Sequence, residues 1–152
     1  MSILRFLLFP FSLLYYLVTR FRNYFYDVGF FKSKTFNIPI IAVGNLSVGG
    51  TGKTPQIEYL IRFLQKKYKV GVLSRGYSRR TKGFIKLENT HTSEDVGDEP
   101  LQYFKKFPKI LVAVDENRAN GIQELQQKQP LDIVLLDDAF QHRKVKANCY
   151  IL

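Results

Sequence analysis

Beyond residue 37, short runs of apolar residues alternate with segments in which apolar residues recur at helical spacing. In the clearest helical segment, residues 54–68, the side chains of Ile57, Leu60, Ile61 and Leu64 fall on one face of a helix. The apolar runs lack the polar–apolar alternation of half-exposed strands, as expected for strands that are covered on both faces. This order predicts an α/β fold with a mostly parallel sheet flanked by helices.

The individual elements follow from these runs and from the turn residues between them. The predicted strands are residues 39–43, 70–74, 84–87, 110–114, 133–136 and 150–152. The predicted helices are residues 54–68, 99–106 and 117–128. Residues 75–83 are predicted to form a basic, glycine-containing loop, and residues 89–96 a polar loop.

The beginning of the chain has a different pattern. Residues 3–18 are apolar or aromatic except for Arg5, Pro10 and Ser12. The uncharged stretch, residues 6–18, is shorter than the roughly 20 residues that a membrane-spanning helix needs. It is followed by arginines and aromatic residues, not by the small-residue cleavage site of a signal peptide.

Arginines and aromatic side chains beside a short apolar helix are typical of the interface between membrane and water. We therefore predict that residues 2–28 form a helix that lies on or dips into the cytoplasmic leaflet, within a membrane-associated domain of residues 1–30. A tilted helix that spans the bilayer, with Arg5 reaching the interface, is a second interpretation. A helix buried against the rest of the protein is a third.

The remaining residues, 31–152, have the length and apolar content of one domain with its own core, since the chain is 45% hydrophobic. The sequence stops where the last predicted strand begins, so we expect this domain to be incomplete at its C-terminus. The single cysteine, Cys149, cannot form an internal disulfide, which indicates a protein that is in or faces the cytosol. Because Cys149 lies in an apolar run, we expect it to be a small core residue.

The net charge of +10 points to an anionic partner or surface. Basic residues flank the apolar N-terminal stretch, which favours a membrane; they are Arg5, Arg20, Arg22, Lys32 and Lys34, with Asp27 as the one acid among them. A second, acid-free cluster follows the strand at 70–74 and favours phosphate groups; it consists of Arg75, Arg79, Arg80, Lys82 and Lys86. The alternative for both clusters is an ordinary solvated basic face. No nucleic-acid partner is predicted, and no pattern indicates the oligomeric state.

The glycine-rich stretch between the first strand and the first helix of residues 31–152 carries the strongest chemical prediction. Strand, glycine-rich loop, Lys-Thr and helix in this order are typical of a phosphate-binding loop for ATP. Backbone N–H groups of such a loop and the helix N-terminus surround phosphate oxygens, the lysine reaches the β- and γ-phosphates, and the threonine hydroxyl binds Mg²⁺. The predicted residues are Ser47, Val48, Gly49, Gly50, Thr51, Gly52, Lys53 and Thr54. Ser47 replaces the usual first glycine, and the paired glycines at 49 and 50 compensate.

Acidic residues follow the apolar run 133–136. Asp137 and Asp138 close that strand as the acids of a Walker B strand do, and are predicted to hold Mg²⁺ beside the phosphate loop. The pattern does not distinguish which of the two contacts the metal. Asp98 and Glu99 open a later helix and act either as a general base or as helix-start residues.

Other polar residues are placed near the predicted site by strand ends. Asp115 and Glu116 either orient a substrate or cap the next helix. Arg75 is predicted to pair with a phosphate or with an acid. His142 is predicted to approach the nucleotide, whereas His91, in a polar loop, is predicted to be inert.

Four segments in this order resemble the tetraacyldisaccharide 4'-kinase (lipid A 4'-kinase) family over essentially the whole chain. They are the phosphate loop with its flanks at 43–55 and the segments 73–77, 96–100 and 137–142. The hydrophobic, basic N-terminal segment is also similar to that of the family. Ala139 departs from the resemblance, because the family usually has glycine there, and family members are about twice as long as this chain.

The resemblance implies a membrane-associated P-loop kinase. Its reaction would move the γ-phosphate of ATP to the 4'-hydroxyl of a tetraacylated glucosamine disaccharide 1-phosphate, giving the lipid IVA precursor of lipid A at the cytoplasmic face of the inner membrane. The matching motifs imply that Asp98 is the general base, that Lys53 and Thr54 serve phosphate and Mg²⁺, and that Asp137 and Asp138 serve the metal. The alternatives are a membrane-bound nucleotide-binding module without kinase activity and an ATPase that uses its N-terminal helix as a membrane switch.

Overall fold

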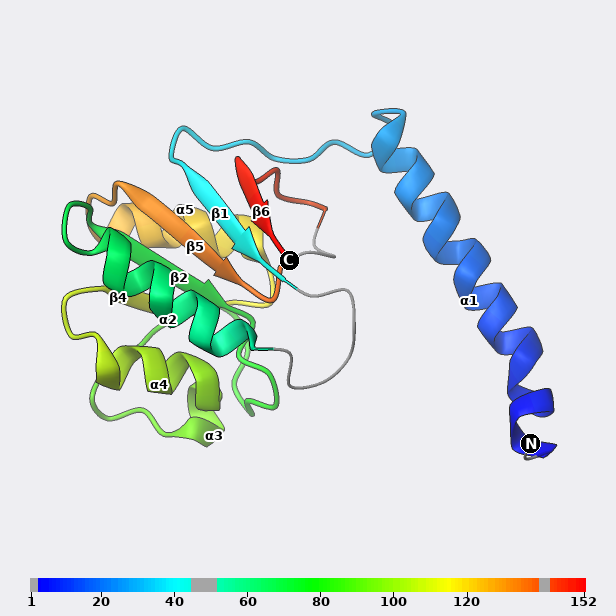
Figure 1. Cartoon of the computed structure of the whole chain (residues 1–152), viewed down its shortest axis with the longest axis horizontal. Helices are drawn as coiled ribbons and strands as arrows, with labels where there is room; N and C mark the ends of the chain where they lie inside the picture. The colour runs from blue at the N-terminus through cyan, green and yellow to red at the C-terminus, as the bar shows by residue number, and fades with distance from the viewer. Residues whose placement is uncertain (1–2, 45–51, 140–142) are drawn as a thin grey trace. The chain divides into compact units, whose positions relative to one another are not determined.

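The computed structural model describes residues 3–44, 52–139 and 143–152, with side chains described from residue 10 onward (Figure 1). The chain divides into two compact units, Met1–Ser33 and Lys34–Leu152.

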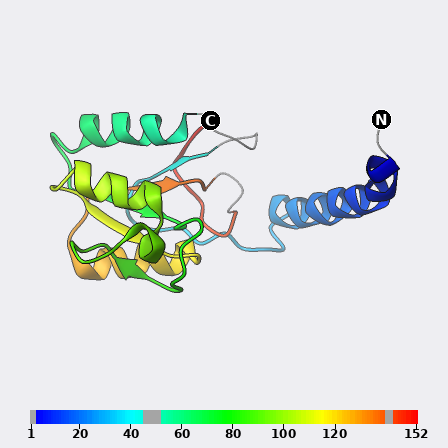
Figure 2. The ribbon, with the colours of Figure 1, turned by 90° about the horizontal axis from the view of Figure 1, so that it is seen from below.

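The first unit is built on one long helix, α1 (Ile3–Asp27), which continues through Pro10 (Figure 1, Figure 2). Large apolar side chains along it are exposed, among them Phe11, Leu14 and Phe21. The predicted N-terminal helix is therefore present and carries exposed apolar surface. Within the described residues, no helix combines the length and the apolar content needed to cross a membrane.

An aromatic cluster follows the end of α1. Gly29 has a left-handed φ of 76°, which glycine adopts without strain, and the N–H of Phe31 then donates to the carbonyl of Phe25 at 3.0 Å. The rings of Phe25, Phe30 and Phe31 come within 5.3, 5.5 and 5.6 Å of one another in tilted and edge-on arrangements. The chain reversal thus folds two aromatic side chains back onto the last turn of the helix.

The second unit contains a six-stranded sheet in the order β3-β4-β2-β5-β1-β6 (Figure 1). Its strands are β1 (Ile40–Val43), β2 (Val70–Ser74), β3 (Ile85–Lys86), β4 (Leu111–Val114), β5 (Ile133–Asp137) and β6 (Cys149–Ile151). All neighbouring strands are parallel except β3 and β4. The predicted α/β fold with a mostly parallel sheet is therefore confirmed.

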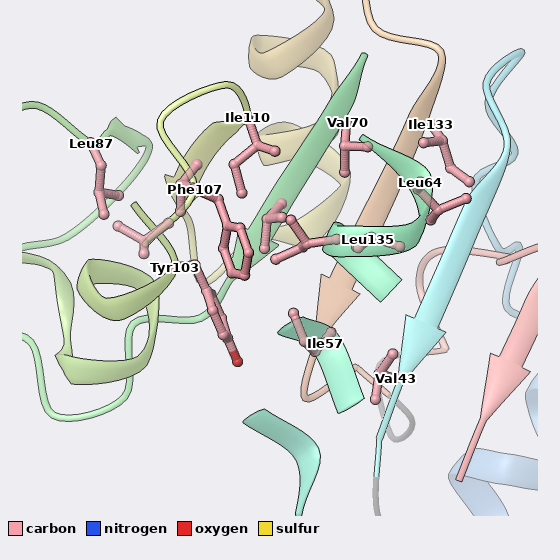
Figure 3. Close-up of a cluster of buried hydrophobic side chains, with 14 of the residues drawn as sticks. Val43, Ile57, Leu64, Val70, Leu87, Tyr103, Phe107, Ile110, Ile133 and Leu135 are labelled. Atoms are coloured by element: carbon pink, nitrogen blue, oxygen red, sulfur yellow. The ribbon is translucent and has the colours of Figure 1, made fainter. Parts of the chain in front are cut away.

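Helices cover both faces of this sheet. They are α2 (Lys53–Leu64), the one-turn α3 (Ser93–Val96), α4 (Asp98–Lys106) and α5 (Arg118–Lys128). Figure 2 shows α2 and α4 on one side of the sheet and α5 on the other. Two clusters of buried apolar side chains fill the layers. In the first, Ile57 and Ile61 of α2 and Tyr103 of α4 pack with side chains from the sheet (Figure 3); in the second, Ile122 and Leu125 of α5 do so.

The register of the parallel strands brings several strand ends to one edge. Val43 at the end of β1 pairs with Asp137 at the end of β5, and Ser74 at the end of β2 pairs with Val114 at the end of β4. Parallel strands of a covered sheet present their carboxyl ends, and the loops after them, on the same side. The segments that follow these four strands therefore share one edge of the sheet.

Three details differ from the prediction. The polar segment 89–96 contains the one-turn helix α3, which is stabilised by a capping box in which Thr92 and Asp95 exchange side-chain and backbone hydrogen bonds. The first helix of this unit ends at Leu64, before the polar residues that precede β2. Cys149 is exposed on the edge strand β6, so its assignment to the core was wrong.

The contact between α5 and β2 generates the first prediction. A Cβ at Gly121 would lie 2.7 and 2.8 Å from the two methyl carbons of Leu73 and 3.0 Å from Cβ of Asp115. Gly121→Ala should lower the free energy of unfolding by about 1–3 kcal/mol through overpacking, although alanine favours helices. Urea unfolding measures this, with Gln123→Ala at an exposed position of the same helix as the control. Unchanged or increased stability of Gly121→Ala would contradict the close contact of α5 with the sheet.

Candidate active site

Helix α2 begins at the carboxyl edge of the sheet. Gly52 precedes it with a left-handed φ of 80° and no side-chain cap, and Lys53 is its first residue. The strand before the glycine-rich stretch and the helix after it lie where the sequence predicts them. The predicted phosphate-contacting residues Ser47, Val48, Gly49, Gly50 and Thr51 lie outside the described residues.

Lys53 contacts the end of β5. Its Nζ atom lies 2.6 Å from Oδ1 of Asp138. Partial burial lowers the pKa of Lys53, but the hydrogen bond and charge of Asp138 and the charges of Asp137 and Glu99 outweigh this and raise the pKa above its usual value. Asp138 is exposed and has a left-handed φ of 51°. The lysine and this carboxylate, both predicted to act at the site, are therefore brought together.

Asp137 is buried, with 1% of its surface exposed. Its Oδ2 accepts a hydrogen bond from the hydroxyl of Tyr103 at 3.4 Å, while its Oδ1 has no hydrogen-bond partner among the described residues. Burial, reinforced by the negative charges of Glu99 and Asp138 and opposed by Arg118, raises the pKa of Asp137 to about 6. The two consecutive aspartates thus have opposite environments.

The donor set at Asp137 fits Mg²⁺. A buried carboxylate oxygen without a partner gains from an adjacent cation, and Mg²⁺ characteristically uses one or two carboxylates together with substrate phosphates and waters. Within the part of the chain that the structure describes, no group of three or more His, Cys, Asp or Glu side chains converges into a cage that could hold a metal by protein ligands alone.

Helix α4 faces the first turn of α2. Thr54 donates a hydrogen bond from its hydroxyl to Oε1 of Glu99 at 2.8 Å. Tyr103, one turn further along α4, is buried and lies between Thr54 and Asp137, and burial raises the pKa of its hydroxyl. The threonine hydroxyl predicted to serve Mg²⁺ therefore lies in a cluster with three acidic or phenolic groups. Neither Glu99 nor Tyr103 is identifiable from the spacing alone as part of this cluster.

Asp98 is the first residue of α4 and is exposed. The N-cap is Gly97, which has a φ of 92° and no side-chain cap, so Asp98 does not serve as a capping residue. Asp98 lines a surface pocket of about 450 Å³ together with Leu101, Gln102, Lys105 and Lys106. An exposed carboxylate beside an open pocket is placed to receive a proton from a bound hydroxyl.

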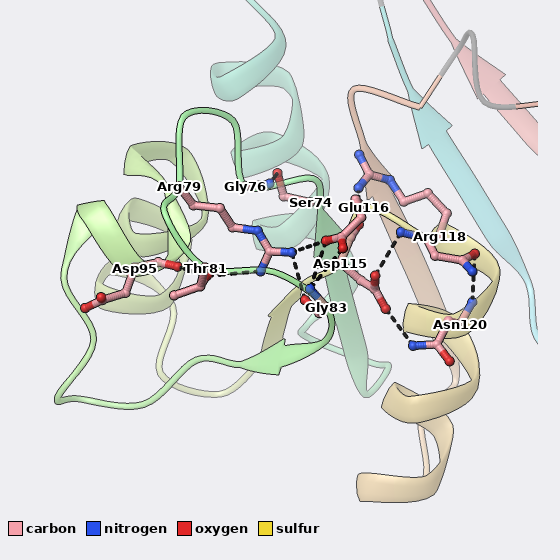
Figure 4. Close-up of polar contacts among 11 residues, drawn as sticks. Ser74, Gly76, Arg79, Thr81, Gly83, Asp95, Asp115, Glu116, Arg118 and Asn120 are labelled. Atoms are coloured by element: carbon pink, nitrogen blue, oxygen red, sulfur yellow. Dashed lines mark hydrogen bonds and ion pairs between the residues drawn. The ribbon is translucent and has the colours of Figure 1, made fainter.

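A buried arginine ties two strand ends together. Arg118 is 2% exposed, and its Nη1 and Nη2 donate to the backbone carbonyls of Asp115 at 2.7 Å and of Asp137 at 2.9 Å. Burial lowers its pKa to about 10. Asp115 accepts hydrogen bonds from the N–H of Asn117 and the amide of Asn120, both at 2.8 Å (Figure 4). The N-cap of α5 is Asn117, so Asp115 does not cap the helix itself but holds the cap residue and Asn120 in place. Sequence reasoning missed the structural role of Arg118.

Part of the second basic cluster is neutralised within the protein. Arg79 pairs with Glu116 and donates to the carbonyl of Gly83 at 2.7 Å (Figure 4). Arg80 pairs with Asp95 at 3.0 Å. Arg75, at the end of β2, is exposed and makes no ion pair with the described residues. The charge of this loop therefore serves mainly to hold the loop, and Arg75 remains the candidate for an anionic ligand.

The two histidines differ in what the structure says of them. Nδ1 of His91 accepts a hydrogen bond from the N–H of Glu88 at 2.9 Å, a local loop contact that agrees with its predicted inert role. His142 lies outside the described residues.

Comparison with known proteins identifies the family of this chain. The model of the family described as tetraacyldisaccharide-1-P 4'-kinase matches residues 4–152. The chain belongs to this family. Two relatives named tetraacyldisaccharide 4'-kinase, from Flavobacterium johnsoniae and Flavobacterium psychrophilum, are 58% and 60% identical to it over its whole length, which spans 45% of each relative.

A solved structure of this kinase family has the same fold. The crystal structure of LpxK from Aquifex aeolicus, described as an "apo" form in complex with ATP, matches 99% of the chain with a TM-score of 0.90 and 42% sequence identity. The match covers 49% of that protein. The chain thus spans about half the length of the relatives it matches.

The environment of Asp137 predicts a gain in stability when its charge is removed. Because its pKa of about 6 in the fold exceeds the value near 3.9 of an unfolded chain, stability falls as pH rises between these two values. At about 1.4 kcal/mol per pKa unit, Asp137→Asn should raise the free energy of unfolding at pH 7 by about 1–3 kcal/mol and abolish this pH dependence. Asp98→Asn, at an exposed carboxylate, should change the free energy of unfolding at pH 7 by less than about 0.5 kcal/mol. Urea unfolding between pH 4 and 7 measures both, and a destabilised Asp137→Asn would contradict the cost of burying this charge.

Proposed function

We propose that this chain carries the nucleotide-binding and catalytic part of an ATP-dependent kinase that phosphorylates the 4'-hydroxyl of a tetraacylated glucosamine disaccharide 1-phosphate. One observation carries the proposal. Lys53 and Thr54 at the start of α2 lie beside Asp137, the last residue of β5, and Asp138, which follows it, and the first turn of α4, which carries Asp98, contacts Thr54 through Glu99. The membership of the family, whose name states this acceptor, supplies the substrate class.

ATP is the proposed phosphoryl donor. The relative from Aquifex aeolicus is described in complex with ATP, and the fold is shared. The segment 47–54 is proposed to surround the phosphates with its backbone N–H groups, as glycine-rich loops before helices do. Lys53, which pairs with Asp138 here, is proposed to turn to the β- and γ-phosphates, because phosphate oxygens are negatively charged, as the carboxylate is.

Mg²⁺ is proposed to bind between the first turn of α2 and the end of β5. Oδ1 of Asp137 has no hydrogen-bond partner among the described residues, and the hydroxyl of Thr54 lies in the same cluster. These two groups would hold the ion together with phosphate oxygens, and Thr54 would exchange its bond to Glu99 for the metal. When bound, Mg²⁺ offsets negative charge on the phosphates. The buried Oδ1 without a partner favours Asp137 as the direct metal ligand.

Asp98 is proposed as the general base. In the transfer, the acceptor hydroxyl gives its proton to the Asp98 carboxylate and its oxygen bonds to the γ-phosphorus. The bond between that phosphorus and the β,γ-bridging oxygen breaks, and ADP leaves. Phosphoryl transfer needs little covalent chemistry from the protein, so positioning and charge stabilisation by Lys53 and the metal supply most of the rate.

A location at the cytoplasmic face of the inner membrane is part of the proposal. The acceptor carries acyl chains that reside in a bilayer, and α1 exposes Leu14, Leu17 and Phe21 at spacings of three and four residues, on one face of the helix. Such a helix buries its apolar face in the headgroup region while its arginines meet anionic lipid. The cluster of Phe25, Phe30 and Phe31 adds aromatic surface at its end.

Transfer of label from [γ-³²P]ATP to the disaccharide 1-phosphate in mixed micelles with Mg²⁺ tests the kinase. Lys53→Ala should lower kcat by roughly 10²–10³-fold, because a charge that stabilises the transition state is lost. Asp98→Asn should lower it by roughly 10²–10⁴-fold, because the general base is lost. Lys128→Ala, at the exposed end of α5, is the matched control and should leave the rate unchanged.

Two results would contradict this function. A wild-type chain that binds ATP with Mg²⁺ but labels no acceptor would favour the nucleotide-binding module. ATP hydrolysis stimulated by plain liposomes, without labelled lipid, would favour the membrane-switched ATPase. Full activity of Asp98→Asn would show that Asp98 is not the general base, but it would not contradict the kinase activity itself.

The membrane role of α1 predicts a loss of vesicle binding. Burying one leucine side chain contributes about 1.5–3 kcal/mol, so Leu14→Asp should weaken binding to vesicles of anionic and zwitterionic phospholipid roughly tenfold or more. Co-sedimentation measures the bound fraction. Tyr59→Asp, at a residue of α2 that is 65% exposed, is the control and should bind as the wild type does. Equal loss in both variants, or in neither, would contradict a specific role of this face of α1.

A further inference from the structure

A row of polar contacts joins α2 to α4 along the length of both helices. It begins with the bond from Thr54 to Glu99 at the first turns. One turn later, Oε1 of Glu58 on α2 accepts from the amide of Gln102 on α4 at 2.8 Å. Oε2 of the same carboxylate accepts from Nζ of Lys106, one turn further along α4. Among the residues of α2 that the structure describes, Glu58 is thus the one whose side chain forms hydrogen bonds with two successive turns of α4.

The spacing shows why these contacts form a row. Thr54 and Glu58 are four residues apart on α2, and their partners on α4, Glu99, Gln102 and Lys106, are three and four residues apart. Residues three or four apart lie on one face of a helix, so the two stripes face each other along the helix axes. Both stripes start at the carboxyl edge of the sheet, where the first turn of α2 carries Lys53 and Thr54 and the first turn of α4 carries Asp98.

Glu58 is a strongly bound carboxylate. It is 5% exposed and accepts from Gln102, from Lys106 and, at 3.1 Å, from Arg62 on its own helix. Burial alone raises its pKa, but the bonds from Lys106 and Gln102 and the nearby positive charges lower it below the usual value. The residue is therefore held ionised, with fixed donors, inside the contact between the helices.

The polar row sets the position of α4 along α2 more narrowly than apolar packing does. The layer between the helices and the sheet is filled by Ile57, Ile61 and Tyr103, and apolar burial is non-directional, whereas a hydrogen bond depends on distance and angle. A carboxylate that bonds donors on two successive turns permits little sliding of the helices, because both bonds break when the helix moves by more than about 1 Å. Its partner Lys106 lies at the surface, with 44% of its side chain exposed, and a partly exposed ion pair contributes at most about 1 kcal/mol to stability.

We propose that Glu58 is a positioning residue for phosphoryl transfer: through Gln102 and Lys106 it sets the position of α4 along α2, and so the position of Asp98 relative to Lys53 and Thr54. The inference rests on the proposed function of Asp98 as base and Lys53 as phosphate ligand. A misplacement of about 1 Å between reacting groups lowers a rate by up to roughly 10²-fold. A contact that does no more than stabilise the fold would leave the rate per folded molecule unchanged.

The key variant is Glu58→Leu/Lys106→Leu, which removes the carboxylate together with its ion-pair partner on α4. The remaining partner, Arg62, has 54% of its side chain exposed and stays hydrated. Crystal structures of this variant and of the wild-type chain test the geometry without any assay of activity. The expected result is a shift of α4 along α2 of about 1 Å or more and loss of the bond from Thr54 to Glu99. An α4 that stays in place would overturn the inference.

Kinetics on the full chain test the consequence. In the double variant and in Glu58→Gln, kcat for phosphoryl transfer should fall roughly ten- to hundredfold while KM for ATP stays within about twofold. Lys106→Arg keeps a cationic donor and should retain most of the rate, and Glu124→Gln, the same chemical change on α5, should retain all of it. A double variant with the wild-type kcat would overturn the inference. A wild-type chain that transfers no phosphate would contradict the proposed function, and the pair of crystal structures then decides the role of Glu58.

Discussion

Burial of the Asp137 carboxylate at the end of a central strand is the constraint on which the arrangement of the site depends. A charge that is 1% exposed is costly, and the surrounding elements reduce the cost from several directions. Tyr103 of α4 donates to one oxygen, and the buried guanidinium of Arg118 at the start of α5 lies close enough to oppose the rise in pKa. The other oxygen keeps no partner among the described residues. A cation bound beside this carboxylate would therefore lower the remaining cost of burying its charge.

The same strand end explains how neighbouring residues acquire different roles. Asp137 is the last residue of β5 and is buried, whereas Asp138 follows the strand, is exposed and contacts Lys53. Helices α2 and α4 begin at this edge and lie on the same face of the sheet (Figure 2). Because both helices run in the same direction, their first turns meet, and a residue well inside α2, Glu58, is in contact with the helix that carries Asp98.

Most of the fold was predictable because it depends on local patterns. Uninterrupted apolar runs identified the central strands, and the spacing of Ile57, Ile61 and Leu64 identified the buried face of α2. The α3 turn was missed because a single turn has no apolar period, and its capping box is the one local pattern that could have indicated it. The exposure of Cys149 was missed because an apolar run does not reveal which strand lies at the edge of a sheet.

The site divides in a similar way. Motifs, which are patterns of residues at short spacings along the chain, predicted Lys53, Thr54, Asp98, Asp137 and Asp138. Their partners Arg118 and Tyr103 could not be found from motifs, because they act through contacts between elements that are far apart in sequence. Their identification required the register of the strands and the direction of the helices. Glu58 belongs to the same class, since a glutamate in the middle of an amphipathic helix ordinarily faces solvent.

The ion pair between Lys53 and Asp138 has a consequence for the turnover of the proposed kinase. With the carboxylate 2.6 Å from the ammonium group, the lysine already has an anionic partner before any nucleotide arrives. An incoming triphosphate would exchange one partner for another and would not have to strip water from a bare cation. After transfer, the reverse exchange would return Lys53 to Asp138 as ADP leaves.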